Sequence, residues 1–113
     1  MRVLIVDDDA WFAESLKGCL SGFEVGIITA ADDIFPAIEQ FRPDILLLDL
    51  ILSEQNAITF LNEFASYDDL QTLRIFVLSS AAKDFDAKTL TDFGVEKVFD
   101  KADFTPQILE AAI

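Results

Sequence analysis

The strongest constraint on the fold is an almost unbroken apolar stretch in the middle of the chain, residues 44–52, with the sequence Asp-Ile-Leu-Leu-Leu-Asp-Leu-Ile-Leu. It lies between Pro43 and the polar residues 53–56, which is typical of a central strand buried on both faces. Asp49 stands near its carboxyl end. Ligands of open parallel sheets bind outside the carboxyl ends of the strands. We therefore expect Asp49 to be either a helix cap or a functional group.

The rest of the chain alternates between strand-like and helical patterns. Four further strands are predicted at residues 2–6, 24–29, 73–78 and 95–100, and helices at 10–20, 31–41, 56–66, 86–93 and 105–113. This alternation predicts one α/β domain over residues 1–113, with a five-stranded parallel sheet and helices on both faces. Because crossovers between parallel strands are right-handed, all the carboxyl ends meet at one edge.

Composition and charge exclude several functions. The chain has 113 residues, of which 52% are hydrophobic, so it can build a core. Its formal net charge of −13 argues against direct binding to nucleic acid or to an anionic membrane surface. The absence of histidine excludes histidine-based catalysis and metal ligation.

The cellular location is predicted from what the sequence lacks. There is no signal peptide, and no apolar run approaches the ~20 residues that span a membrane. The single cysteine, Cys19, cannot form an internal disulfide, which fits a reducing compartment. Cys19 lies among apolar residues and is expected to be a packed thiol. We therefore expect a cytoplasmic protein.

Polar residues follow four of the five predicted strands. They are Asp7, Asp8 and Asp9 after the first strand, Asp49 in the third, Ser79 and Ser80 after the fourth, and Lys101 after the fifth. Carboxylates gathered in one crevice repel each other, and a hard cation such as Mg²⁺ relieves this repulsion. A nearby hydroxyl and ammonium suit a phosphoryl group. The predicted site is therefore suited to phosphoryl transfer to or from a carboxylate. Asp9 is better explained as the N-cap of the first helix.

Four motifs in this order give the chain a family resemblance. They are Val-Asp-Asp-Asp at 6–9, Leu-Leu-Asp-Leu-Ile-Leu at 47–52, Val-Leu-Ser at 77–79 and Phe-Asp-Lys at 99–101. With this spacing the chain resembles, over essentially its whole length, the receiver domain of two-component response regulators. The resemblance implies a flavodoxin-like fold of five βα units.

The resemblance also implies a metal site. In that family the second acid after the first strand, here Asp8, binds Mg²⁺ directly, and the first acid, here Asp7, binds it mainly through water. Asp49 and the backbone carbonyl of Ile51 would complete the protein's ligands. Mn²⁺ is expected to substitute for Mg²⁺.

Three roles around the phosphoryl group follow from the same resemblance. Asp49 would be the phosphoacceptor, Ser79 the switch hydroxyl and Lys101 the cation that contacts the phosphoryl oxygens. The implied partners are a histidine kinase or histidine phosphotransfer protein and a downstream protein that the sequence does not identify. A homodimer is also compatible with the family.

The chain departs from the family pattern in the switch region. The family's switch aromatic lies three residues before the lysine, and Val98 occupies that position. Phe99 is offset by one residue and is expected to point to the other face of the sheet. The usual coupling between a moving hydroxyl and a swinging ring is therefore not expected here.

Two alternative functions stay open. The first is a phosphorylation-independent binding module with the same fold, a pseudo-receiver, which the unusual switch region favours. The second is a small haloacid-dehalogenase-like phosphatase, in which Asp7 would be the nucleophile of an Asp-x-Asp motif. The chain is short for that fold and lacks a clear acidic pair after Lys101.

Overall fold

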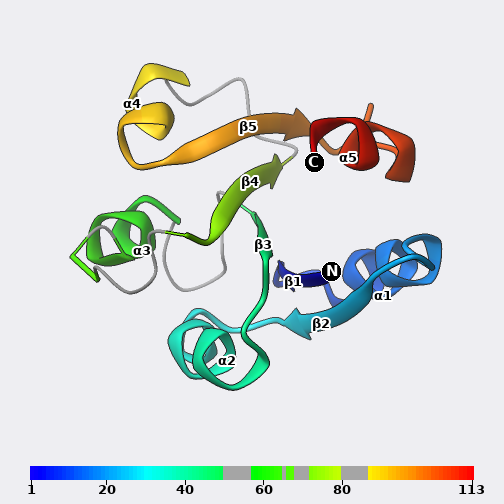
Figure 1. The fold of residues 1–113 in the computed structure, drawn as a ribbon, viewed down its shortest axis with the longest axis horizontal. Helices are drawn as coiled ribbons and strands as arrows, with labels where there is room; N and C mark the ends of the chain where they lie inside the picture. The colour runs from blue at the N-terminus through cyan, green and yellow to red at the C-terminus, as the bar shows by residue number, and fades with distance from the viewer. Residues whose placement is uncertain (50–56, 65, 68–71, 80–86) are drawn as a thin grey trace.

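The computed structural model describes residues 1–49, 57–64, 66–67, 72–79 and 87–113. Five parallel strands form one sheet in the order β2-β1-β3-β4-β5 (Figure 1). The strands are β1 (Arg2–Val6), β2 (Glu24–Ile28), β3 (Ile45–Leu48), β4 (Arg74–Ser79) and β5 (Val95–Asp100). The predicted α/β architecture with a parallel sheet is therefore confirmed.

A helix follows each strand. The helices are α1 (Ala10–Cys19), α2 (Ile34–Phe41), α3 (Ala57–Phe64), α4 (Ala87–Asp92) and α5 (Pro106–Ala112). Figure 1 shows α1 and α5 on one side of the sheet and α2, α3 and α4 on the other. The described elements end within a few residues of the predicted bounds, and part of the predicted third strand, residues 50–52, lies outside the described residues.

The sheet separates two apolar cores. Along β3, Ile45 and Leu47 pack into the core shared with α1 and α5, while Leu46 and Leu48 pack into the core shared with α2 and α3. All four are at most 1% exposed, as predicted for a strand buried on both faces. Asp49 directly follows this strand, so its position rests on the best-packed part of the molecule.

Two sequence expectations about the helices are wrong in detail. A 3-10 turn occupies Ala31–Asp33, so the second α-helix begins only at Ile34, with Pro36 in its first turn, where a missing N–H breaks no intrahelical bond. Cys19 is exposed rather than packed. The buried stripe of α1 passes through Ala13, Leu16 and then Leu20, and Cys19 lies beside that stripe.

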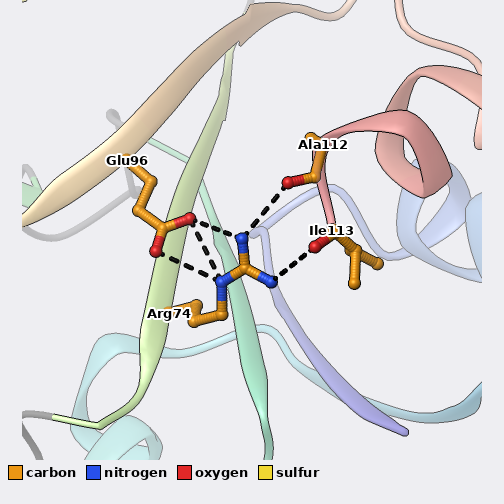
Figure 2. Close-up of polar contacts among 4 residues, drawn as sticks. All are labelled: Arg74, Glu96, Ala112 and Ile113. Carbon is orange, nitrogen blue, oxygen red and sulfur yellow. Dashed lines mark hydrogen bonds and ion pairs between the residues drawn. The ribbon is translucent and has the colours of Figure 1, made fainter.

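At the amino ends of the strands, two arginines each link an edge strand to the end of a helix. Figure 2 shows Arg74, the first residue of β4, paired with Glu96 on the edge strand β5, with an Nη2–Oε2 distance of 2.9 Å. Its guanidinium also donates to the backbone carbonyls of Ala112 and Ile113 at the end of α5, both at 3.2 Å. Arg2 of β1 repeats this arrangement with Glu24 of the other edge strand and the carbonyl of Phe41 at the end of α2, both at 2.9 Å.

Candidate functional site

Two buried aspartates lie side by side at the carboxyl edge of the sheet. Among the described residues, Asp7 and Asp49 are the buried charged side chains, 2% and 7% exposed. The Asp7 N–H donates to the Ile28 carbonyl at 3.1 Å, and the Asp49 N–H donates to the Val6 carbonyl at 2.9 Å. The parallel hydrogen-bond pattern therefore continues one residue past β1 and β3, and it places both carboxyl groups just beyond the sheet.

The turn from β1 into α1 is held by its own acidic side chains. Asp7 Oδ1 accepts a hydrogen bond from the Asp9 N–H at 2.9 Å, and Asp9 Oδ1 accepts from the Phe12 N–H at 3.1 Å. Asp9 is thus the N-cap of α1, as predicted. Asp8, between them, is exposed and makes neither of these bonds.

Three of the four predicted metal ligands come together. Asp7, Asp8 and Asp49 each present a carboxylate oxygen, and these oxygens lie within 4.8 Å of one another. A small set of carboxylate oxygens, one of them exposed, fits a hard cation that keeps several waters, as Mg²⁺ does. The fourth predicted ligand, the carbonyl of Ile51, lies outside the described residues.

Lys101 brings the positive charge of the site. It follows β5, and its Nζ lies 2.6 Å from Asp7 Oδ2 and 3.6 Å from Asp49 Oδ2. Burial lowers the pKa of Lys101, but the hydrogen bond to Asp7 and the charges of Asp49 and Asp7 outweigh it and raise the pKa above its usual value. The side chain is therefore an ammonium at neutral pH.

The switch region is described only in part. Ser79 is the last residue of β4 and is paired in register with Asp100 of β5. Its hydroxyl and the neighbouring Ser80 lie outside what the structure describes, so the predicted switch role stays a prediction. Val98 is 37% exposed, whereas the Phe99 ring packs 6.0 Å from Phe76 and 5.4 Å from Phe104, centroid to centroid. The two side chains therefore point to opposite faces, as expected from the alternation along a strand.

One residue at the site was not predicted from the sequence. The Phe12 ring lies under the Lys101 ammonium, 4.5 Å from Nζ to the ring centroid. The periodicity of α1 indicated only an apolar position at Phe12. The available signal was its place three residues after the cap Asp9, which puts it in the first turn of the helix that leaves the site.

Comparison with known proteins gives the family. The family model described as the response regulator receiver domain matches residues 3–113. The chain belongs to this family, whose members are signalling switches of two-component systems and bind Mg²⁺ at an acidic pocket. Response regulators of this kind interact with histidine kinases. Among the described residues, no helix is long and apolar enough to span a membrane.

Individual relatives agree with this assignment. The chain is 42% identical over 59 residues to the DNA-binding response regulator MtrA of Mycolicibacterium paratuberculosis, covering 50% of this chain and 26% of that protein. It is 36% identical over 93 residues to a protein-glutamate methylesterase/protein-glutamine glutaminase of Sulfurimonas denitrificans, covering 77% of this chain and 26% of the relative. This chain therefore spans about a quarter of these curated relatives.

Solved structures show the same fold. The signal receiver domain of a DNA-binding response regulator from Colwellia psychrerythraea superposes with a TM-score of 0.87 at 21% identity, covering 98% of this chain and 93% of that one. A putative response regulator from Chloroflexus aurantiacus gives 0.80 at 27% identity, covering 97% of this chain and 91% of that one. The flavodoxin-like receiver architecture is thus shared by proteins of low sequence identity.

Proposed function

We propose that this chain accepts a phosphoryl group on Asp49 from a histidine kinase or histidine phosphotransfer protein, and that phosphorylation changes its binding to a downstream protein. The observation that carries the proposal is the cluster of Asp7, Asp8, Asp49 and Lys101 at one sheet edge. Three carboxylates and one ammonium match the needs of phosphoryl transfer to a carboxylate, in which charge on several oxygens must be neutralised.

Each residue has a distinct task in this reaction. An Asp49 oxygen attacks phosphorus as the bond from phosphorus to the donor's imidazole nitrogen breaks, and the imidazole leaves with the bonding electrons. Lys101, already beside Asp49, pairs with the transferred phosphoryl oxygens. Asp7, Asp8 and Asp49 would hold Mg²⁺ or Mn²⁺, and the bound metal supplies further neutralisation of phosphoryl charge. Asp7 also holds the Lys101 ammonium at the site before transfer.

In this proposal the protein acts in the cytoplasm as a signalling switch and does not turn over a substrate. Its phosphoryl chemistry is limited to its own Asp49, and the partner kinase supplies the group. The net charge of −13 supports a role without direct contact to nucleic acid or membrane. A homodimer is compatible with this role.

The test is phosphoryl uptake from acetyl phosphate with Mg²⁺, followed by mass spectrometry of the intact chain and of its peptides. We expect one phosphoryl group on Asp49 and none on the Asp49→Asn variant, because an amide is not a competent nucleophile. No stable adduct on the wild-type chain would favour the phosphorylation-independent binding module. Turnover with the label on Asp7 would instead favour the phosphatase.

A further inference from the structure

The Lys101 ammonium has an aromatic neighbour in addition to its two carboxylates. Its Nζ lies 4.5 Å from the centroid of the Phe12 ring, within the range of a cation–π contact. The same nitrogen is 2.6 Å from Asp7 Oδ2 and 3.6 Å from Asp49 Oδ2. The cation is therefore bounded by two anionic oxygens and one aromatic face.

The acidic turn holds the backbone of Phe12 next to the site. Asp7 bonds the Asp9 N–H, Asp9 bonds the Phe12 N–H, the Phe12 ring contacts Lys101, and Lys101 returns to Asp7. These four contacts form a closed circuit. They link the first turn of α1 to the Lys101 ammonium.

Lysine needs such support more than most side chains. Its ammonium stands on a flexible four-carbon stem with many rotamers. Beside the ring a groove of about 180 Å³ opens between α1 and the start of α5, lined by Lys101 together with Phe12, Leu16 and Phe104. Without the ring, the stem would gain room to swing into this groove and away from Asp49.

An aromatic face is well suited to this task. It attracts the cation through its quadrupole but does not neutralise it, and it offers no oxygen that would compete with a phosphoryl group for the N–H donors. A carboxylate in the same place would neutralise the cation and would also compete with the phosphoryl group for its N–H donors. The ring can thus hold the ammonium without itself occupying an N–H donor.

We propose that Phe12 is a positioning residue for phosphoryl transfer, which acts by holding the Lys101 ammonium next to Asp49 through a cation–π contact. This inference rests on the proposed function, because it assigns Phe12 a part in the uptake of the phosphoryl group by Asp49. Phe12 acts through Lys101, since a phenyl ring offers no donor to a phosphoryl oxygen and no oxygen ligand to Mg²⁺.

The test weakens the ring's quadrupole without changing its shape. Phe12 is replaced in the 113-residue chain by 4-fluoro-, 3,5-difluoro- and 3,4,5-trifluorophenylalanine, and uptake from acetyl phosphate is measured at saturating Mg²⁺. We expect the rate to fall stepwise with each added fluorine, by about three- to tenfold over the series. Phe12→Tyr, which keeps a π face, should stay close to wild type. The same series at Phe60, whose ring packs against Phe35 and Phe64, should change the rate little.

Two further readouts separate positioning from mere packing. The Lys101 Cε–Hε NMR signal should show a ring-current shift that shrinks along the fluorinated series and is lost in Phe12→Leu, whereas a ring that only packs would keep the full shift in the fluorinated chains. Mg²⁺ affinity should stay unchanged throughout the series, because fluorination of Phe12 leaves the carboxylates of Asp7, Asp8 and Asp49 in place. A flat rate across the fluorinated series, with Phe12→Leu slow, would overturn the proposal and leave only a packing role.

Failure of the underlying function would look different. If the wild-type chain took up no phosphoryl group on Asp49, the proposed function would fail, and the proposal for Phe12 in that reaction would fall with it. If uptake were normal but independent of fluorination, only the role of Phe12 would fail.

Discussion

At the scale of single residues, two neighbouring acids have opposite environments. Asp7 is buried because the strand pattern continues through its N–H and because Lys101 pairs with its carboxylate. Asp8 is exposed and lies next to the same cluster of oxygens. An exposed carboxylate loses little solvation when no metal is bound, so Asp8 is free to serve mainly as a ligand.

The first prediction concerns Asp8. We expect Asp8→Ala to weaken Mg²⁺ binding by about tenfold or more, since loss of even an outer partner of a metal ligand costs about 10- to 100-fold. Isothermal titration calorimetry measures this change. Asp9→Asn is the matched control: it removes a negative charge one residue away but keeps an N-cap side chain. Equal weakening in both variants would mean that only net charge, and not ligation, is involved.

The second prediction concerns the pH dependence of stability. Because the folded-state pKa of Lys101 is raised, its ion pairs contribute stability that is fully present below the unfolded pKa of about 10.4 and is lost as pH rises through the higher folded pKa. Chemical denaturation between pH 9 and 12 should therefore show a fall in the free energy of unfolding of the wild-type chain. The Lys101→Met variant should not show this fall.

Lys97→Met is the control variant for the stability measurements at alkaline pH. Lys97 is an exposed lysine of β5, so this variant should lose stability with pH as wild type does. A Lys101→Met chain that follows the same curve would show that the Asp7 and Asp49 contacts contribute nothing to folding.

At the scale of elements, the sequence predicted which segments form strands and helices better than where they begin and end. The caps Asp9 and Thr105 are local patterns and are found as predicted, as is the strand that leads into Asp49, over its described residues Ile45–Leu48. The 3-10 turn before α2 has no such pattern. The contact between Phe12 and Lys101 joins α1 to the end of β5, and a distance between elements cannot be read from spacing along the chain.

The third prediction concerns the attachment of α5. Arg74 ties the last carbonyls of α5 to the Glu96 carboxylate through a planar group with several donors, which lysine cannot reproduce (Figure 2). We expect Arg74→Lys to speed amide hydrogen exchange at the end of α5 several-fold, since local opening reports local contacts. The Ile113 N–H, which donates to the Leu109 carbonyl, is the amide to follow.

The corresponding variant at the other edge strand is Arg2→Lys. Arg2 bonds the end of α2, so exchange there should increase while exchange in α5 stays at its wild-type rate. Faster exchange over the whole chain in either variant would indicate global destabilisation instead of a local attachment.

At the scale of the whole molecule, topology gathers residues that lie far apart in the sequence. The order β2-β1-β3-β4-β5 places the ends of β1 and β3 side by side, and the ends of β4 and β5 next to them. Right-handed crossovers made this gathering predictable, including the meeting of Asp7, Asp8, Asp49 and Lys101. The arginine pairs occupy the opposite edge, where the strands begin. The carboxyl edge therefore carries the aspartate cluster with its lysine, and the amino edge carries the two arginine–glutamate pairs.

The exposed indole of Trp11 allows the electrostatic potential near the acidic turn to be measured by fluorescence. Trp11 is 78% exposed and is the second residue of α1, just past the acidic turn, and it is the chain's single tryptophan. In a molecule with a net charge of −13, the local potential attracts cations and repels anions. Relative to free N-acetyltryptophanamide, caesium quenching of Trp11 should therefore be enhanced and iodide quenching reduced at equal, low ionic strength. Adding Mg²⁺ should reduce the difference between caesium and iodide quenching more in the wild-type chain than in Asp8→Ala. An equal reduction in both chains would mean that the metal binds away from this turn.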